Sequence, residues 1–123
     1  MNEKYRLTIF IDAIPESLNV SMRTHYFQYN SKKKFWNELV RMHCINKLPK
    51  EPLKKAHLKI TRHFWRMLDY DGFVGSLKPV VDALIYAGVI SDDRWSVVGK
   101  WDVDQIYRPK KDGPLLKIEI FEE

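Results

Sequence analysis

The stretch SLKPVVDALIYAGV, residues 76–89, predicts the helix around which the rest of the fold is arranged. Its apolar residues stand at positions 77, 80, 81, 84 and 85, the stripe of a helix that packs on a sheet. Ser76 is the expected N-cap, and Pro79 falls in the first turn, where its missing N–H matters least. Gly88 is expected just past the helix end, in the left-handed conformation, with Val89 packing after it.

The segments around this helix alternate polar and apolar residues, which indicates strands. They are KYRLTIFIDAI (4–14), KKAHLKITRHFW (54–65, with positions 58, 60 and 63 facing inward), WSVVGKWDVDQIYR (95–108) and PLLKIEIFE (114–122). The last two are expected to form a hairpin through the turn PKKDG.

A long polar and aromatic loop, residues 15–30, follows the first strand. Asn30 or Ser31 then caps a helix that ends near Lys47, with one broad face of larger residues at positions 35, 36, 39, 40, 43 and 44. The order is therefore β-α-β-α-β-β, and it predicts an α+β fold, a mixed β-sheet with two main helices packed on one face.

Composition limits the class of protein. The 123 residues suit a single domain, and 45% apolar residues suffice for a core. A net charge of +5 favours an acidic partner, of which nucleic acid is the commonest. Cys44 is the only cysteine, which excludes an intrachain disulfide and a thiolate zinc site and suits a buried core thiol. The N-terminus does not read as a secretory signal and no apolar run is long enough to span a membrane, so a cytoplasmic protein is expected.

Acidic residues gather at both ends of the main helix. If Asp69 and Asp71 extend the preceding strand, their spacing puts both carboxylates on one face. Two carboxylates that close repel, and a hard divalent cation such as Mg²⁺ relieves the repulsion. Gly72 and Gly75 predict a turn before the helix. Asp92 and Asp93 follow the helix, and they return to Asp69 only if the next strand enters the sheet beside the strand before Asp69; otherwise they are turn residues.

Lys78 and Asp82 stand four residues apart on the polar face of the helix. One interpretation is a surface ion pair. The other is that Lys78 faces a metal cluster and a phosphate, because a lysine in the first turn opposes the helix dipole and so invites a further role. A second pair, Asp102 and Asp104, alternates with apolar residues and is interpreted as a solvated strand face.

As a whole, DYDGFVGSLKPVVDALIYAGVISDD, residues 69–93, resembles the signature of the RusA-type Holliday-junction resolvases, small endonucleases of phages and prophages. That signature is Asp-x-Asp-Asn, a short gap, Lys, then Asp-Ala-Leu, a small residue and Gly, an apolar pair and Asp-Asp. Order and spacing agree over these 25 residues, and the rest of the chain agrees more loosely. One position departs: Gly72 stands where the family has asparagine.

The resemblance implies that Asp69, Asp71 and Asp93 are metal-binding catalytic carboxylates, that Asp92 is a neighbouring metal-binding acid, and that Lys78 is the catalytic lysine. The expected cofactor is Mg²⁺, with Mn²⁺ as the alternative. The family also implies a homodimer that cuts opposed strands of a four-way DNA junction. The expected function is thus a Mg²⁺-dependent, structure-selective DNA endonuclease that resolves Holliday junctions and other branched DNA.

Basic residues outside this stretch are candidate DNA contacts: Arg23, Lys32, Lys33, Lys34, Lys110 and Lys111. The three consecutive lysines are expected at a helix start, where free N–H groups also favour phosphate. Each group is equally compatible with a solvated charge run. Two alternatives to the nuclease stay open: a non-catalytic protein that binds branched DNA, and an unrelated metal hydrolase of a small phosphate ester.

Overall fold

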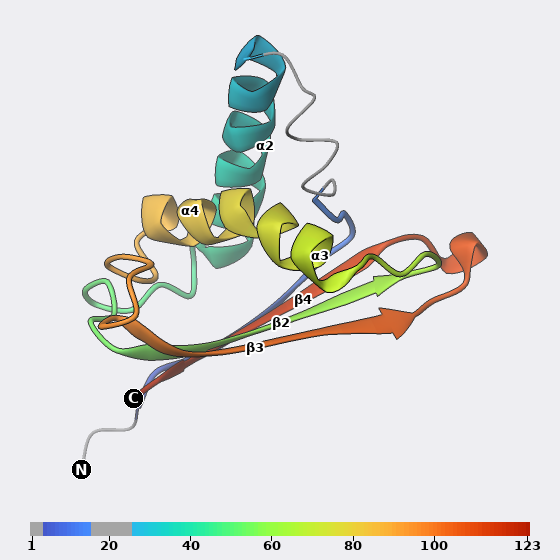
Figure 1. The fold of residues 1–123 in the computed structure, drawn as a ribbon. Helices are drawn as coiled ribbons and strands as arrows, with labels where there is room; N and C mark the ends of the chain where they lie inside the picture. Colours follow the sequence, from blue (N-terminus) through green and yellow to red (C-terminus); the bar gives the residue numbers. More distant parts are fainter. Residues whose placement is uncertain (1–3, 16–25) are drawn as a thin grey trace.

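The computed structural model describes residues 4–15 and 26–123, with the backbone alone for residues 26–30. A four-stranded sheet carries the helices on one face (Figure 1). The elements are β1 (Arg6–Ile11), α2 (Tyr26–Cys44), β2 (Ala56–Phe64), α3 (Tyr70–Ser76), α4 (Lys78–Ala87), β3 (Val98–Tyr107), the 3₁₀ turn η1 (Lys110–Asp112) and β4 (Leu115–Glu122). The predicted α+β class and the order β-α-β-α-β-β are confirmed, with the second helical segment divided into α3 and α4.

The strand order is β1-β4-β2-β3, so the predicted hairpin of the last two strands is wrong. β3 pairs in parallel with β2, whereas β4 lies antiparallel between β1 and β2. The chain after β3 passes around the end of β2, where the Arg108 amide donates to the Phe64 carbonyl at 2.9 Å. η1 then returns it to the middle of the sheet (Figure 1).

The central place of β4 follows from its side chains. Leu116, Ile118 and Ile120 are fully buried, and Ile118 pairs with Ile9 of β1 on one side and Ile60 of β2 on the other. β3 is mostly exposed or partly exposed beyond Val98, which suits an edge. Because a central strand is shielded by neighbours on both sides, the strand with the most continuous apolar row gains most by occupying it.

The predicted alternation of the first two strands is confirmed at Leu7, Ile9 and Ile11 and at Leu58 and Ile60, all buried. The prediction that residue 63 joins this row is wrong. A strand has a period of two, so residue 62 follows residue 60 on the helix-covered face, and the row ends in a buried arginine.

The helix α2 begins at Tyr26, before the predicted cap at Asn30 or Ser31, and ends at Cys44 rather than near Lys47. Residues 16–25 of the predicted loop lie outside the described residues. Trp36, Val40 and Cys44 are buried as predicted. Phe35, predicted on the same face, is 54% exposed because one apolar stripe does not accommodate every neighbouring large residue.

The predicted turn at Gly72 and Gly75 is wrong, because these residues belong to α3. Ser76 is the last residue of α3, where its hydroxyl donates to the Phe73 carbonyl at 2.6 Å, and Leu77 takes the N-cap position of α4. Phe73 and Leu77 are almost fully buried. Their burial offsets the cost of glycine inside a helix, so the helical segment begins earlier than its glycines suggest.

The end of α4 agrees with the prediction. Pro79 lies in the first turn, and Gly88 has φ 89°, ψ 20° at the C-cap, with its amide bonded to the Ile85 carbonyl at 3.1 Å. Val80, Val81 and Leu84 are buried in the core between helix and sheet. The loop after Gly88 then leads to β3 at the edge of the sheet (Figure 1).

Candidate functional site

Asp69 and Asp71 do not extend a strand, as the sequence had suggested. β2 ends at Phe64, Asp69 is the N-cap residue of α3, and Asp71 lies in the first turn of that helix. The Phe73 amide donates to the Asp69 carbonyl at 3.0 Å, so the backbone of Asp69 opens the helix while its carboxylate makes no capping bond. Both residues are exposed. The two carboxylates are thus available to a ligand but do not share one strand face.

Gly72 lies directly against the carboxylate of Asp69. A Cβ atom at Gly72 would stand 2.7 Å from Asp69 Oδ1, closer than any ordinary contact. The asparagine of the RusA-type signature would therefore displace the Asp69 side chain from its place here. In this chain the glycine allows the carboxylate to fold over the first turn of α3.

Lys78 lies between the start of α4 and Asp93, the acid that follows this helix. It opens α4, and its Nζ lies 3.5 Å from Asp82 Oδ1 and 3.9 Å from Asp93 Oδ2. The Lys78 side chain is 63% exposed, and that of Asp93 is 41% exposed. Pairs this open to water contribute little to stability, which leaves both groups available to a charged ligand.

Asp92 has a different environment from Asp93. The Asp93 amide donates to Asp92 Oδ1 at 2.7 Å, and the guanidinium of Arg94 binds Asp92 Oδ2 through Nε at 2.8 Å and Nη2 at 2.7 Å. The backbone hydrogen bond and the Arg94 guanidinium lower the pKa of Asp92 below its usual value. Asp92 is therefore an ionised turn residue, and Asp93 is the acid that faces the lysine.

The acidic residues are of the chemical type that binds a hard cation, but those that the structure describes are not grouped closely enough to share one ion. Carboxylate oxygens are the ligands that Mg²⁺ and Mn²⁺ take in proteins. Within residues 4–15 and 26–123, however, no three or more His, Cys, Asp or Glu side chains are grouped closely enough to hold one ion. In the same part of the chain, neither Asp69 nor Asp71 forms an ion pair with Lys78. No catalytic step is therefore assigned to a metal.

A polar cluster that the sequence reasoning missed lies just before Asp69. Gln105 on β3 bonds both backbone groups of Leu68: Leu68 N donates to Oε1 at 2.9 Å, and Nε2 donates to Leu68 O at 2.9 Å. Arg62, only 3% exposed, donates from Nη1 to Gln105 Oε1 at 3.1 Å and to Arg66 O at 2.6 Å. The signal available in the sequence was an arginine at a core position of β2.

The candidate DNA contacts fall in separate places. Lys32, Lys33 and Lys34 lie in the second and third turns of α2, not at its start, because the helix begins at Tyr26. Lys110 and Lys111 are exposed on η1, at the end of the sheet where β2 leads to α3 (Figure 1). Arg23 lies outside the described residues.

The second acidic pair, Asp102 and Asp104, was predicted to lie on a solvated strand face, and this holds for only one of the two residues. Asp104 is exposed, but Asp102 Oδ2 lies 2.7 Å from Nε2 of His57 on the neighbouring strand. The His57 ring lies beside Phe121, with ring centroids 5.5 Å apart. This pair supports the sheet face away from the helices and has no contact with the candidate site.

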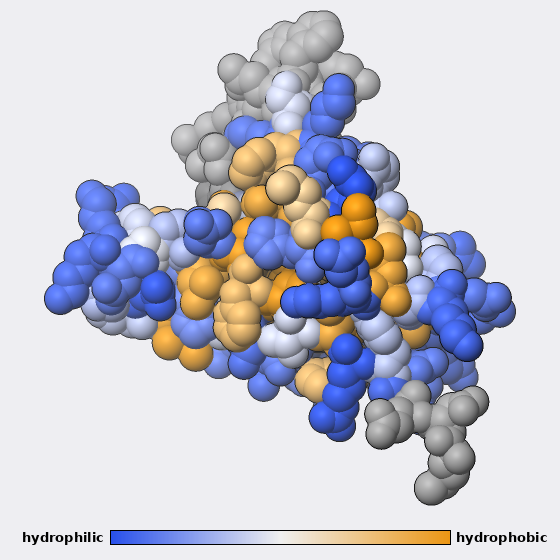
Figure 2. All heavy atoms as spheres, turned by 180° about the vertical axis from the view of Figure 1, so that it is seen from behind, coloured by the Kyte–Doolittle hydropathy of each residue, from blue (hydrophilic) through white to orange (hydrophobic). Residues whose placement is uncertain are grey.

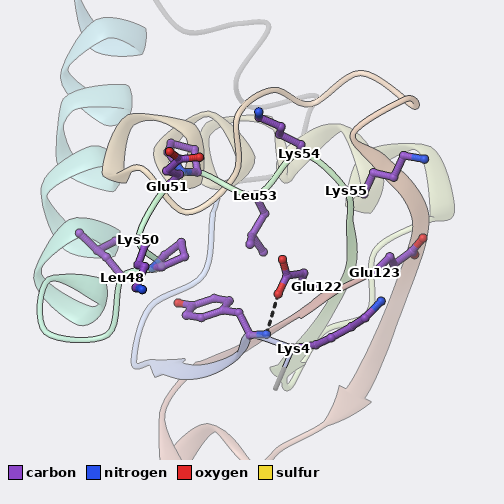
Figure 3. Close-up of a pocket in the computed structure, with 12 residues that line it drawn as sticks. Lys4, Leu48, Lys50, Glu51, Leu53, Lys54, Lys55, Glu122 and Glu123 are labelled. Atoms are coloured by element: carbon purple, nitrogen blue, oxygen red, sulfur yellow. Dashed lines mark hydrogen bonds between the residues drawn. The ribbon is translucent and has the colours of Figure 1, made fainter. Parts of the chain in front are cut away.

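A pocket of about 1120 Å³ opens near the start of β1, away from every predicted site residue (Figure 3). Lysines 4, 50, 54 and 55 line it together with glutamates 51, 122 and 123. The Tyr5 amide donates to Glu122 Oε1 at 2.8 Å across its floor. The lining charges nearly cancel, so the pocket offers neither a strongly basic nor a strongly acidic surface.

No protein-family model and no curated protein sequence matches the chain. Among the described helices, none has both the length and the apolar character needed to cross a bilayer.

Proposed function

We propose that the protein is a structure-selective endonuclease that cleaves four-way and other branched DNA. The observation that carries the proposal is the order of acids and lysine along residues 69–93, together with the approach of Lys78 Nζ to Asp93 Oδ2 at 3.9 Å. The stretch that resembles the RusA-type signature thus brings an exposed cation, Lys78, close to Asp93, the acid that follows α4. The pair supports a site where charge builds up on a phosphate.

Lys78 is proposed to stabilise negative charge on the scissile phosphate. Its ammonium is exposed, and it can donate to the oxygens of a phosphodiester as negative charge grows on them during cleavage. Asp82 and Asp93 form only loose, exposed ion pairs with it, which a phosphate can replace. Asp69, Asp71 and Asp93 are the proposed catalytic carboxylates, and the requirement for Mg²⁺ or Mn²⁺ stays a prediction.

The basic residues of the chain support a DNA partner. Lys110 and Lys111 are exposed on η1, which lies at the end of the sheet where β2 ends (Figure 1), and Lys33 and Lys34 are exposed on α2. An overall charge of +5 attracts a polyanion at long range. The affinity for DNA should therefore fall steeply with salt concentration.

A homodimer is part of the proposal, because paired cuts in a junction need two sites. Figure 2 shows apolar side chains gathered in the middle of one face and hydrophilic ones around them. Exposed apolar surface of this kind is typical of faces that contact other proteins. Light scattering after gel filtration tests the dimer: a monomer at micromolar concentration contradicts it.

A non-catalytic protein that binds branched DNA is the second candidate. It is favoured by the separation of the acids, which do not form a metal-binding group among the described residues. Such a protein binds junctions without a divalent ion and never cuts them.

One experiment separates the two candidates. A labelled four-way junction and a linear duplex of the same sequence are incubated with the protein, with Mg²⁺, with Mn²⁺ and with chelator. Asp71→Asn tests the acidic residue, and Asp12→Asn, which removes another exposed carboxylate just after β1, is the matched control. Cleavage that depends on the metal and on residue 71 supports the nuclease. Junction binding with no cleavage in either metal overturns it in favour of the second candidate.

A further inference from the structure

We infer that Gln105 and Arg62 are positioning residues, which clamp the backbone of residues 66–68 and so fix the direction of Asp69. The inference deepens the proposed nuclease function and rests on it. Neither residue belongs to the resemblance over residues 69–93, and neither is placed to touch DNA by anything described above. Their role would be to hold a proposed catalytic residue, not to react.

The first part of the clamp is the amide of Gln105. Its oxygen accepts from the Leu68 N–H and its nitrogen donates to the Leu68 carbonyl, both at 2.9 Å. A side-chain amide that pairs with both groups of one residue imitates a strand neighbour. Gln105 pairs with Arg62 in the β2–β3 ladder, before β2 ends at Phe64, so its amide ties the returning chain at Leu68 to this level of the sheet.

The second part is the buried guanidinium of Arg62. Arg62 Nη1 bonds Gln105 Oε1 and the Arg66 carbonyl, and the guanidinium lies 4.6 Å from the centre of the Phe64 ring. Its Nε is buried without a hydrogen-bond partner, and no carboxylate of the described residues forms an ion pair with it. A cation buried this way is costly, so packing alone is a poor reason for its presence.

The clamp reaches the candidate site through one peptide unit. Leu68 precedes Asp69, whose carbonyl accepts the first helical bond of α3 from Phe73 at 3.0 Å. Asp69 is thus held on one side by Gln105 through Leu68 and on the other by α3. With both neighbours tied, the Cα–Cβ direction of Asp69 is set, and its carboxylate lies over Gly72.

Gln105→Ala removes the clamp and Gln105→Glu keeps part of it. The glutamate can still accept from Leu68 N–H and from Arg62, but it cannot donate to the Leu68 carbonyl. Ile106→Ala is the matched control, because residue 106 is the next one on β3 and is 45% exposed. Thermal unfolding of each variant shows that it is folded at the assay temperature.

The first measurement is amide hydrogen exchange, which needs no nuclease activity. In the wild type the Leu68 amide should exchange at least about tenfold more slowly than in Gln105→Ala, with Gln105→Glu close to the wild type. The amides of β4 should be unaffected in all three variants. An unprotected Leu68 amide in the wild type, or equal protection in Gln105→Ala, overturns the clamp.

The second measurement separates positioning from general stability. The single-turnover cleavage rate of Gln105→Ala should fall about 10- to 100-fold while its affinity for the junction stays within about twofold, since small displacements of a reacting group are costly. Gln105→Glu should recover most of the rate. If the wild type cuts junctions and Gln105→Ala cuts them equally fast, the positioning role is wrong. If the wild type cuts no DNA, the proposed function falls and the catalytic role of the clamp falls with it, whereas the exchange result still decides whether the clamp exists.

Discussion

Replacing Lys78 should abolish most of the cleavage while leaving the fold almost untouched. The Lys78 side chain is 63% exposed, and its contacts with Asp82 and Asp93 are 3.5 and 3.9 Å long. Exposed pairs of this kind contribute roughly 0.2–1 kcal/mol. A lysine in the first turn of a helix loses roughly 0.3–1 kcal/mol against the helix dipole. The two effects nearly cancel, so the free energy of unfolding of Lys78→Gln should stay within about 0.5 kcal/mol of the wild type.

The expected effect on chemistry is much larger. Removing a single group that stabilises charge in a transition state typically costs about 10²- to 10³-fold in rate. Lys78→Gln should therefore lower the single-turnover cleavage of a four-way junction by that factor. Lys78→Arg keeps the charge but not the compact ammonium, so it should retain an intermediate rate.

The control is Lys100→Gln, which removes an exposed positive charge from β3 and so accounts for the general attraction of DNA. Urea unfolding measures stability, a mobility-shift titration measures junction affinity, and a time course with excess protein measures cleavage. Equal cleavage by Lys78→Gln and Lys100→Gln would refute the catalytic role. A loss of stability well above about 1 kcal/mol would show that Lys78 is structural instead.

Three further predictions concern single residues. Burial raises the pKa of the Cys44 thiol to about 11, so a thiol reagent at neutral pH should modify Cys44 only on unfolding; rapid modification of the native protein would contradict its burial. Burial, with Arg108 and Lys117 nearby, lowers the pKa of His63, so the unfolded chain binds more protons at this residue than the folded one. The stability that depends on neutral His63 is complete above about pH 6.5 and is lost as the pH falls below it. Urea titrations at several pH values should therefore show a free energy of unfolding that changes less with pH for His63→Gln than for the wild type. Gly72→Ala should leave stability equal or up to about 1 kcal/mol higher while cleavage falls, because the new Cβ displaces the Asp69 carboxylate; undiminished cleavage would mean that this orientation does not matter.

The core was predictable because it follows from local periodicity. Strands with a period of two and a helix with a period of 3.6 identified Ile9, Ile60 and Leu84 as buried without any knowledge of how the elements pair. Gly88 was predictable for a similar reason, since a left-handed residue after a helix favours glycine. These features depend on a few neighbouring residues each.

Strand pairing was not predictable in the same way. The turn after Tyr107 suggested a hairpin, but β4 gains more by pairing with β1 and β2 than with β3. That pairing depends on which strand buries most apolar surface at the centre of the sheet. Ile118 of β4 is fully buried there, between Ile9 of β1 and Ile60 of β2. No local pattern records this comparison of strands. The buried position of Arg62, unlike the strand pairing, could have been predicted, because it follows Ile60 by two residues in a strand of alternating burial.

In the candidate site too, the features set by neighbouring residues were predictable from the sequence, and the contacts between distant residues were not. The spacing of residues 69–93 corresponds to two consecutive helices, α3 and α4, so agreement in spacing is first of all agreement in helix length. It places Asp69 at one end of this helical segment and Asp93 beyond the other, which by itself does not bring them together. The lysine is the informative residue, since it reaches from the start of α4 to the acid that follows it. A nuclease built on this segment therefore depends more on the approach of Lys78 to Asp93 than on the number of its acids, which is why Lys78 is the residue to test first.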